Sequence, residues 1–372
     1  MHNQTIPTTY ATLSREQLQD RIAQRKRELG SQLVILGHHY QCDDVIAFAD
    51  FVGDSLKLSQ QAASLTGVRF VVFCGVHFMA ESANILSPSA TVALPNPAAG
   101  CAMADLADDT DLAAAIDDLS AVTGARVVPI TYVNSTAAVK AVTARAGGAC
   151  CTSSNVRNVF AWALTPANQG GAGADKILAV PDRNLGINTA VAMGFAPADC
   201  VVYDPRREHG GLGVEQIRAA RFLLWKGHCY VHQRFTTDQI HAARQQRPGV
   251  RVMVHPECPR DVVALADDAG STEQIIRAVN ESADVHDWAI GTESNLVNRL
   301  AARHPAKRIH TLGDAPALCA QMGQIDLPHL LWTLDSLAAA GNDDPPHTVR
   351  VPTTTADAAR LALERMIAIK AG

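Results

Sequence analysis

The stretch Leu33-Val34-Ile35-Leu36-Gly37-His38-His39-Tyr40 decides the fold of this chain. Its first four residues are apolar and predict a buried strand, and polar side chains follow directly where that strand ends. An apolar helical stretch from Val45 to Val52 comes next and ends at Gly53-Asp54-Ser55. In parallel α/β sheets, ligands meet the residues just past the carboxyl ends of the strands. His38 and Tyr40 therefore stand where a ligand site is expected.

The same order of elements returns in the last third of the chain. Val252-Met253-Val254 is followed by His255-Pro256-Glu257, then by a helical stretch and by Gly270-Ser271-Thr272. His38 lies 17 residues before Ser55, and His255 lies 17 residues before Thr272. In both places a strand ends in acid–base side chains, and a hydroxyl residue follows at the start of a helix. This shared order indicates a repeated unit.

A looser copy lies between these two. Residues 127–130 predict a strand, Tyr132-Val133-Asn134 follow it, and Cys151-Thr152-Ser153-Ser154-Asn155 end the copy. Strands that alternate with helices predict parallel sheets with right-handed crossovers. We therefore expect an α/β fold of three homologous three-layer αβα domains with short parallel sheets, in a pseudo-threefold arrangement around a central site.

The expected segments follow the three copies. They are a lead-in helix at residues 1–30, αβα domains at 31–118, 119–212 and 249–325, a connecting segment with Cys229 at 213–248, and C-terminal helices at 326–372. Periodicity predicts strands at 33–36, 69–74, 91–94, 127–130, 149–151, 177–180, 200–202, 251–254, 287–290 and 308–312. It predicts helices at about 43–52 and 260–268, after the two histidine motifs.

Composition restricts the class of protein. The chain has 372 residues, of which 47% are apolar and 19% charged, with a net charge of −5. These values are typical of a globular protein of two or three domains. The acidic balance and the 5% of aromatic residues argue against nucleic-acid binding. No apolar run approaches the roughly 18 residues of a membrane span, and no signal peptide is found, so we expect a cytoplasmic location without membrane contact.

Nine cysteines are a high count for a cytoplasmic chain. The number is odd and no export signal is found, so a disulfide framework is not expected. Cys101, Cys229 and Cys319 each lie in a loop-like context in a different third. Three thiolates that converge from three domains suit an iron–sulfur cluster with one open iron. A closed structural zinc site usually has four ligands and often C-x-x-C spacing, which this chain lacks, but spacing alone does not decide between these sites.

The remaining cysteines are interpreted as packing residues, since free cysteine is a common small core residue. Cys74 and Cys200 lie in apolar runs, and the pattern assigns no role to Cys42, Cys150 and Cys151. Cys258 is the substitute if one of the three proposed ligands is not a ligand.

Ten motifs resemble those of the quinolinate synthase family, the cluster enzymes of de novo NAD biosynthesis, and they occur in the order of that family over roughly residues 15–340. They are Gly37-His38-His39-Tyr40-Gln41, Gly53-Asp54-Ser55, Asn96-Pro97 through Gly100-Cys101-Ala102-Met103-Ala104-Asp105, Tyr132-Val133-Asn134-Ser135, Cys151-Thr152-Ser153-Ser154-Asn155, Pro181-Asp182-Arg183-Asn184-Leu185-Gly186, Trp225-Lys226-Gly227-His228-Cys229, His255-Pro256-Glu257-Cys258, Gly270-Ser271-Thr272 and Gly291-Thr292-Glu293.

The resemblance implies a [4Fe-4S] cluster, one per chain, held by Cys101, Cys229 and Cys319. It implies condensation of iminoaspartate (iminosuccinate) with dihydroxyacetone phosphate to quinolinate, with loss of phosphate and two waters. It also implies functional coupling to an L-aspartate oxidase or an aspartate dehydrogenase that supplies iminoaspartate. The implied substrate contacts are His38, Ser55, Tyr132, Val133, Asn134, Ser153, His255, Pro256, Glu257 and Thr272.

The residue types suit this chemistry. Proton transfers during isomerisation, imine formation and dehydration need acid–base groups, and the candidates are His38, Tyr40, Tyr132, His255 and Glu257, with Glu257 as the principal one. Hydroxyls at helix N-termini favour bound carboxylates and phosphate, although Ser55, Ser153 and Thr272 could instead be plain N-caps.

The sequence departs from the family pattern near the third cysteine. The proline that often follows it is absent from Leu318-Cys319-Ala320-Gln321-Met322, and no extra C-x-x-C pair is present, so a disulfide redox switch is not expected. Two other interpretations remain open: another [4Fe-4S] dehydratase that acts on a small carboxylate, and a non-enzymatic iron–sulfur sensor or electron carrier. A carrier normally shields its cluster with four protein ligands and would not need His38, Tyr40 and Glu257 around it.

Overall fold

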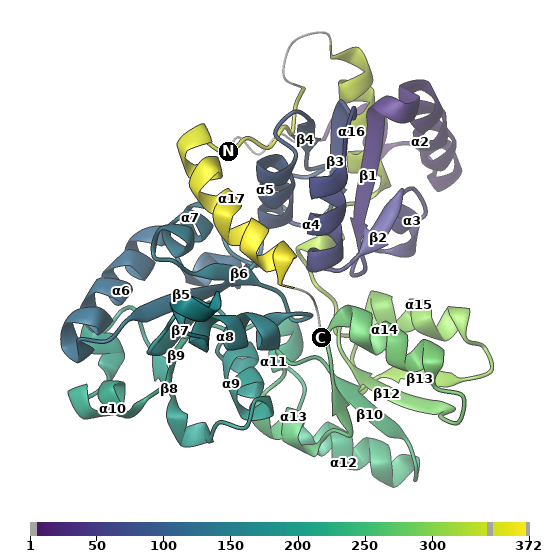
Figure 1. Ribbon diagram of the computed structural model, residues 1–372. Coiled ribbons are helices and arrows are strands. Elements are labelled where there is room, and N and C mark those ends of the chain that lie inside the picture. Colours follow the sequence, from purple (N-terminus) through teal and green to yellow (C-terminus); the bar gives the residue numbers. More distant parts are fainter. Residues whose placement is uncertain (1–5, 341–344, 370–372) are drawn as a thin grey trace. The chain divides into compact units, whose positions relative to one another are not determined.

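The structure is a computed structural model that describes residues 6–340 and 345–369. Its described residues form an α/β fold with three parallel sheets flanked by helices (Figure 1). The chain divides into two compact units, which are described separately below. Unit 1 joins the part up to Cys101 with Leu318–Pro352, and unit 2 joins Ala102–Ala317 with the part from Thr353 onward.

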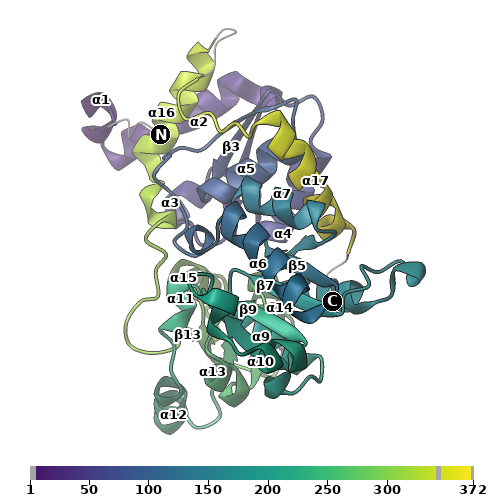
Figure 2. The same cartoon turned by 90° about the vertical axis from the view of Figure 1, so that its left-hand side faces the viewer.

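Unit 1 contains one four-stranded sheet in the order β2-β1-β3-β4. Its strands are β1 (Leu33–His38), β2 (Phe51–Gly53), β3 (Phe70–Cys74) and β4 (Thr91–Ala93). Its helices are α1 (Thr8–Ala11), α2 (Arg15–Leu29), α3 (Asp43–Ile46), α4 (Ser55–Ser64), α5 (His77–Leu86) and α16 (Leu327–Ala339). Helix α2 packs on α16 and α4 packs on α5, and the sheet lies between these pairs in both views (Figures 1 and 2). Helix α2 begins with a capping box of Ser14 and Gln17.

Unit 2 contains two sheets, and the larger has five strands in the order β6-β5-β7-β9-β8. Its strands are β5 (Val127–Tyr132), β6 (Ala149–Cys151), β7 (Lys176–Val180), β8 (Cys200–Tyr203) and β9 (Phe222–Trp225). The helices around it are α6 (Asp109–Thr123), α7 (Ala137–Arg145), α8 (Val156–Leu164), α9 (Arg183–Ala192) and α10 (Val214–Ala219). Leu119, Val142, Leu178, Ile217 and Leu223 join α6, α7 and α10 to one face of the sheet in a single buried cluster. Each such side chain contributes about 1.5–3 kcal/mol relative to exposure.

The other sheet of unit 2 has four strands in the order β11-β10-β12-β13. Its strands are β10 (Arg251–Val254), β11 (Asp268–Ala269), β12 (Asp287–Gly291) and β13 (Arg308–Thr311). The helices of this part are α11 (Tyr230–Gln233), α12 (Thr237–Gln246), α13 (Arg260–Leu265), α14 (Thr272–Glu281) and α15 (Ser294–Arg303). The last helix, α17 (Thr353–Ala368), packs on α7 and β6 (Figure 2). No helix among the described residues is both long and apolar enough to cross a membrane.

The first and last copies of the repeat share a backbone device as well as a sequence pattern. In unit 1 the Asp50 amide donates to the Ile35 carbonyl, and the Asp50 carboxylate accepts the Ile35 amide at 2.8 Å. In unit 2 Asp267 makes the same reciprocal pair with Val252, with the carboxylate 2.7 Å from the amide nitrogen. Both aspartates precede a short edge strand. The repeated unit predicted from sequence therefore has a common local structure.

All ten predicted strands are confirmed, and the structure adds three that the sequence pattern did not indicate: β2, β9 and β11. The predicted helix at about 43–52 is wrong beyond Ile46, because Phe51–Gly53 instead forms β2 beside β1. The predicted helix at about 260–268 ends at Leu265, because Asp268–Ala269 pairs with β10. The segment 213–248, expected as a connection, contains β9, which lies between β7 and β8. The predicted domain boundaries and the pseudo-threefold arrangement remain predictions.

Candidate active site

In unit 1, the end of β1 holds His38 and Tyr40 in a tight turn. The His38 side chain is 5% exposed, and its Nδ1 accepts the Tyr40 backbone N–H at 3.1 Å. The two rings meet edge to face, with centroids 4.7 Å apart. In the neutral ring this hydrogen bond puts the proton on Nε2, which is then the nitrogen that can donate.

In unit 2, the end of β10 repeats this turn with His255 and Glu257. His255 Nδ1 accepts a hydrogen bond from the Glu257 backbone N–H, with the two nitrogens 3.3 Å apart. Both side chains are almost fully buried, at 2% exposure each. The repeat therefore holds a histidine and a second acid–base group in equivalent positions at two sheet edges.

A third group, His232 of α11, completes the surroundings of Glu257. Its Nδ1 lies 2.6 Å from Glu257 Oε2, its Nε2 lies 3.2 Å from Thr292 Oγ1, and its ring stacks on His255 with centroids 4.3 Å apart. Tyr132, at the end of β5, also hydrogen-bonds the Glu257 carboxylate. The structure thus brings Tyr132, His255 and Glu257 together, as predicted for one site, and adds His232. Its position three residues after Cys229 was the signal in the sequence that could have indicated it.

The environment sets the charges of this group. Burial acts to raise the pKa of the Glu257 carboxyl, but His232, His255 and the Tyr132 hydroxyl outweigh it and lower that pKa to about 2. Burial, with His232 nearby, lowers the pKa of His255 to about 3. At neutral pH, therefore, Glu257 is a carboxylate and His255 is a neutral imidazole.

The predicted hydroxyl groups are not the side chains that cap the helices. Asp54 caps α4 by accepting the Lys57 N–H, and Ser271 caps α14 by accepting the Gln274 N–H, so Ser55 and Thr272 are the first helical residues. At α8 the residue before the helix is Asn155, not Ser153. Ser55, Ser153 and Thr272 therefore do not act as N-caps in this structure. Their substrate contacts remain predictions.

Two further predicted residues lie beside β5. Asn134 Oδ1 is buried and has no hydrogen-bond partner among the described residues, which is the condition of an acceptor shaped for a ligand donor. The backbone N–H of Val133 donates to the Cys151 carbonyl at 2.8 Å, so that N–H is already engaged. In the last sheet, Pro256 presents its carbonyl to Asn188 at 2.8 Å.

The nine cysteines fall into two sets. Cys101, Cys229 and Cys319 are partly exposed, with Cys101 and Cys319 in unit 1 and Cys229 in unit 2. Burial raises the pKa of the thiol in every other cysteine: to about 12 in Cys74 and Cys150, to about 11 in Cys200, and upward in Cys42, Cys151 and Cys258. Metal ligands must be thiolates, so a raised pKa makes these six poorer candidates for metal ligands. Cys42 and Cys200 share the partial exposure of Cys101, Cys229 and Cys319. The Cys258 thiol also donates to the Gly291 carbonyl at 3.6 Å, as a packing thiol would.

Cys229, His232 and Glu257 form a compact set of metal-binding atoms. One sulfur, one nitrogen and one carboxylate oxygen lie within 4.8 Å of one another. The buried acid–base group is therefore next to one of the predicted cluster ligands.

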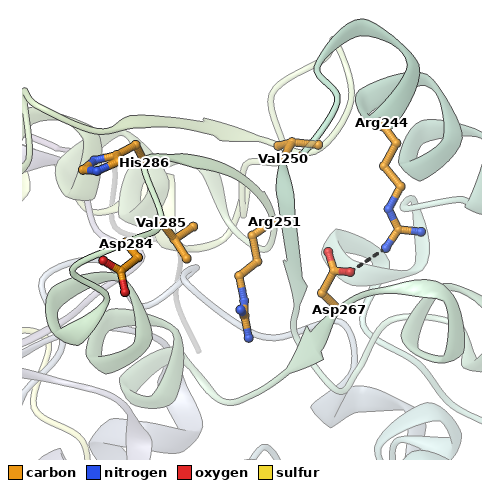
Figure 3. A pocket seen from close by; sticks show the side chains of 8 residues that line it. Arg244, Val250, Arg251, Asp267, Asp284, Val285 and His286 are labelled. Carbon is orange, nitrogen blue, oxygen red and sulfur yellow. Dashed lines mark hydrogen bonds and ion pairs between the residues drawn. The ribbon is translucent and has the colours of Figure 1, made fainter.

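A solvent-open hollow lies elsewhere in unit 2. It has a volume of about 560 Å³ and is open to solvent at the amino ends of β10 and β12 (Figure 3). Arg244 in its wall is paired with Asp267 at 2.9 Å, and Arg251 is paired with Asp268 at 2.6 Å. Because its arginines are paired and His255 and Glu257 lie at the other end of the sheet, we do not assign the active site to this hollow.

Comparison with known proteins identifies the family of this chain. The family model of the quinolinate synthetase A protein matches residues 20–368. The chain belongs to this family. A quinolinate synthase of a Nocardioides species is 49% identical over 356 residues, which cover 95% of this chain and 89% of that protein. The quinolinate synthase of Bacillus subtilis is 44% identical, over 99% of this chain and 97% of that one. That of Streptomyces coelicolor is 48% identical, over 92% and 86%. This member of the quinolinate synthetase A family is an enzyme.

Proposed function

We propose that this enzyme condenses iminoaspartate with dihydroxyacetone phosphate to quinolinate and releases phosphate and two waters. The observation that carries the proposal is the buried Glu257 carboxylate, held by His232 and Tyr132 within 4.8 Å of the Cys229 and His232 ligand atoms. A condensation followed by two dehydrations needs repeated proton transfer beside a group that activates oxygen leaving groups.

The proposed cofactor is one [4Fe-4S] cluster held by Cys101, Cys229 and Cys319. When bound, it supplies a Lewis-acidic iron that can hold a substrate carboxylate or hydroxyl. This assignment is supported at Cys229 by geometry, because its sulfur lies within 4.8 Å of ligand atoms of His232 and Glu257. Burial also raises the pKa of the six other thiols, which disfavours their thiolate forms.

The side chains of the candidate site transfer protons and bind the substrates. Glu257 is ionised at neutral pH and accepts a proton from substrate carbon or nitrogen, and Tyr132 and His232 are the groups that can return one. Asn134 hydrogen-bonds a substrate carboxylate or the imine, a role supported by its buried Oδ1, which has no hydrogen-bond partner among the described residues. His38 and Tyr40 supply a second acid–base pair, and Ser55, Ser153 and Thr272 offer hydroxyls and helix amides to carboxylates and phosphate. An L-aspartate oxidase or an aspartate dehydrogenase in the cytoplasm is the proposed source of iminoaspartate.

The cluster is tested by removing its ligands one at a time. Anaerobic iron and sulfide quantitation of the wild type is expected to give about four irons per chain, the number in a [4Fe-4S] cluster. Cys101→Ser, Cys229→Ser and Cys319→Ser should each lose the cluster and its visible absorption. The matched control, Cys258→Ser, should keep both. A cluster that survives any of the three changes contradicts the ligand set, and loss in the control makes Cys258 a ligand.

The acid–base assignment is tested separately with Glu257→Gln. General base catalysis typically contributes about 10²–10⁴-fold, so quinolinate formation should fall by that factor while iron and sulfide stay at the wild-type level. Glu281→Gln, the same change at the exposed end of α14, should leave the rate unchanged. Wild-type turnover in Glu257→Gln would remove Glu257 from the mechanism. A wild type that binds the cluster but forms no quinolinate would favour another dehydratase or a sensor.

A further inference from the structure

Helix α9 begins with a side chain that holds the loop of Cys229. Asp182 caps the helix, with Oδ1 accepting the Leu185 N–H at 2.8 Å, while Oδ2 accepts the backbone N–H of Cys229 at 3.0 Å. The first helical N–H, that of Arg183, donates to the Gly227 carbonyl at 3.0 Å. A Cβ at Gly227 would lie 2.3 Å from the Pro181 carbonyl oxygen, so only glycine permits this close approach. The start of α9 and the Cys229 loop therefore pack as one piece.

Two asparagines in the first two turns of the same helix hold the loop of Glu257. Asn184 Nδ2 donates to the Glu257 carbonyl at 3.0 Å. Asn188 Nδ2 donates to the Pro256 carbonyl at 2.8 Å and to the Cys258 carbonyl at 2.9 Å. The two asparagines are four residues apart, so they project from one face of the helix, and both are buried. Three successive carbonyls of one loop thus receive amide donors from one helix.

This pattern has an energetic consequence. A carbonyl that loses its donor away from water destabilises the structure, and displacing residues 256–258 from α9 would remove the donors of three carbonyls at once. Asn184 also donates to Gln233 Oε1 at 3.0 Å, on the helix that carries His232. Helix α9 is therefore bonded to the segments of Cys229, His232 and Glu257 together.

We propose that Asp182, Asn184 and Asn188 are positioning residues that set the placement of Glu257 relative to Cys229. The inference rests on the proposed function, in which Cys229 binds the cluster and Glu257 transfers protons. Asp182 acts through the backbone of Cys229, and the two asparagines act through the backbone of Glu257. One rigid helix then fixes a distance that neither loop could fix alone.

Variants of Asn188 test the Glu257 side. Asn188→Asp turns a carboxylate toward two carbonyl oxygens, and Asn188→Ala removes both donors. A misplacement of about 1 Å can cost about 100-fold in rate. We expect kcat to fall by roughly this factor in Asn188→Asp and less in Asn188→Ala, with iron and sulfide retained and KM changed less than kcat. Thr189→Ala, which removes only a buried bond to Leu185 within the helix, is the matched control and should keep its kcat.

Asp182→Ala tests the placement of Cys229. In this variant we expect the iron content to change, whereas in the Asn188 variants we expect iron to be retained and kcat to fall. Iron per chain should fall, and the cluster that remains should be lost faster on exposure to air. Asp182→Asn can accept only one of the two amides and should lie between the alanine variant and the wild type.

A readout independent of the reaction separates this proposal from the proposed function. Hydrogen exchange measured by mass spectrometry should rise in residues 255–259 of Asn188→Ala and in residues 226–233 of Asp182→Ala, and not in the reverse combination. This result is expected even if the wild type makes no quinolinate, so the two proposals fail separately. Wild-type kcat and unchanged exchange at 255–259 in both Asn188 variants would overturn the positioning role. Unchanged iron and exchange at 226–233 in Asp182→Ala would do the same for the Cys229 side.

Discussion

At the scale of single residues, burial and neighbouring groups together set the charges of His255 and Glu257. His255 has its pKa lowered to about 3, chiefly by burial, and cannot act as an acid at neutral pH. Glu257 has its pKa lowered to about 2, since His232, His255 and Tyr132 outweigh the effect of burial. An ionised carboxylate beside a neutral imidazole accepts protons and hydrogen bonds. If the proposed function holds, His255 is not the proton donor, which leaves Tyr132, His232, the pair His38 and Tyr40, or a group of the substrate.

The same effect makes stability depend on pH at His310, away from the site. Burial and the neighbouring Arg247 lower the pKa of this half-buried histidine from its usual 6.5 to about 4. Between these values the unfolded chain binds a proton that the folded chain does not, so stability is lost as pH falls from about 6.5 to 4. A fully buried group would lose about 1.4 kcal/mol per pKa unit, and partial exposure reduces this to about 1 kcal/mol in total.

We therefore expect His310→Gln to flatten the pH dependence of stability. Between pH 7.5 and 5 the wild-type urea midpoint should fall more than that of the variant, with both measured anaerobically. His241→Gln, on the exposed face of α12, should follow the wild type. Parallel curves for the wild type and His310→Gln would show that His310 does not contribute.

At the scale of helices and strands, the sequence was informative wherever an element is buried on both faces. The five residues of β3 form a continuous apolar run because parallel strands are covered on both sides, and this run was predicted correctly. Edge strand β2 could not be predicted in this way. Phe48, Ala49, Phe51 and Val52 continue a helical period, but the bonds between Asp50 and Ile35 are non-local and terminate it. Short-range periodicity contains no information about such a partner.

The residues of the candidate site likewise differ in whether a local sequence pattern could indicate them. The sequence indicated that His255 and Glu257 lie together past a strand end, because their motif is local, and their catalytic roles stay predictions. His232 was missed, since its role depends on α11 bringing it 2.6 Å from a carboxylate 25 residues away. Asn184 and Asn188 belong to the same class: each hydrogen-bonds the backbone of a loop about 70 residues distant. A side chain that serves another segment's backbone leaves no periodic signal.

At the scale of the whole chain, the two C-terminal helices serve different units. Helix α16 packs on α2 in unit 1, and α17 packs on α7 and β6 in unit 2. The end of α17 also reaches a predicted substrate loop, because Asn155 Nδ2 donates to the carbonyls of Met366 and Ile369 at 2.9 and 3.0 Å. Residues of the last helix thereby hold the loop that carries Ser153.

The contribution of α17 to unit 2 can be measured with two leucines of one helix. Leu363 is fully buried on the face shared with Ala359 and Met366, whereas Leu361 is 51% exposed. Leu363→Ala creates a cavity and should destabilise the unit by about 2–5 kcal/mol, because a packed core relaxes only in part. Leu361→Ala makes the same chemical change on the surface and should stay within about 0.5 kcal/mol of the wild type.

Thermal unfolding of both variants, prepared and measured anaerobically in the same way as the wild type, gives the comparison. If α17 positions the 151–155 loop as well as closing the core, Leu363→Ala should also raise the KM for the substrate that Ser153 is predicted to contact, at a temperature where the protein remains folded. Equal midpoints for the two variants would mean that the α17 face contributes little to unit 2. A lowered midpoint with unchanged KM would restrict α17 to a stabilising role, and the bonds from Asn155 would then fix the helix end rather than the substrate loop.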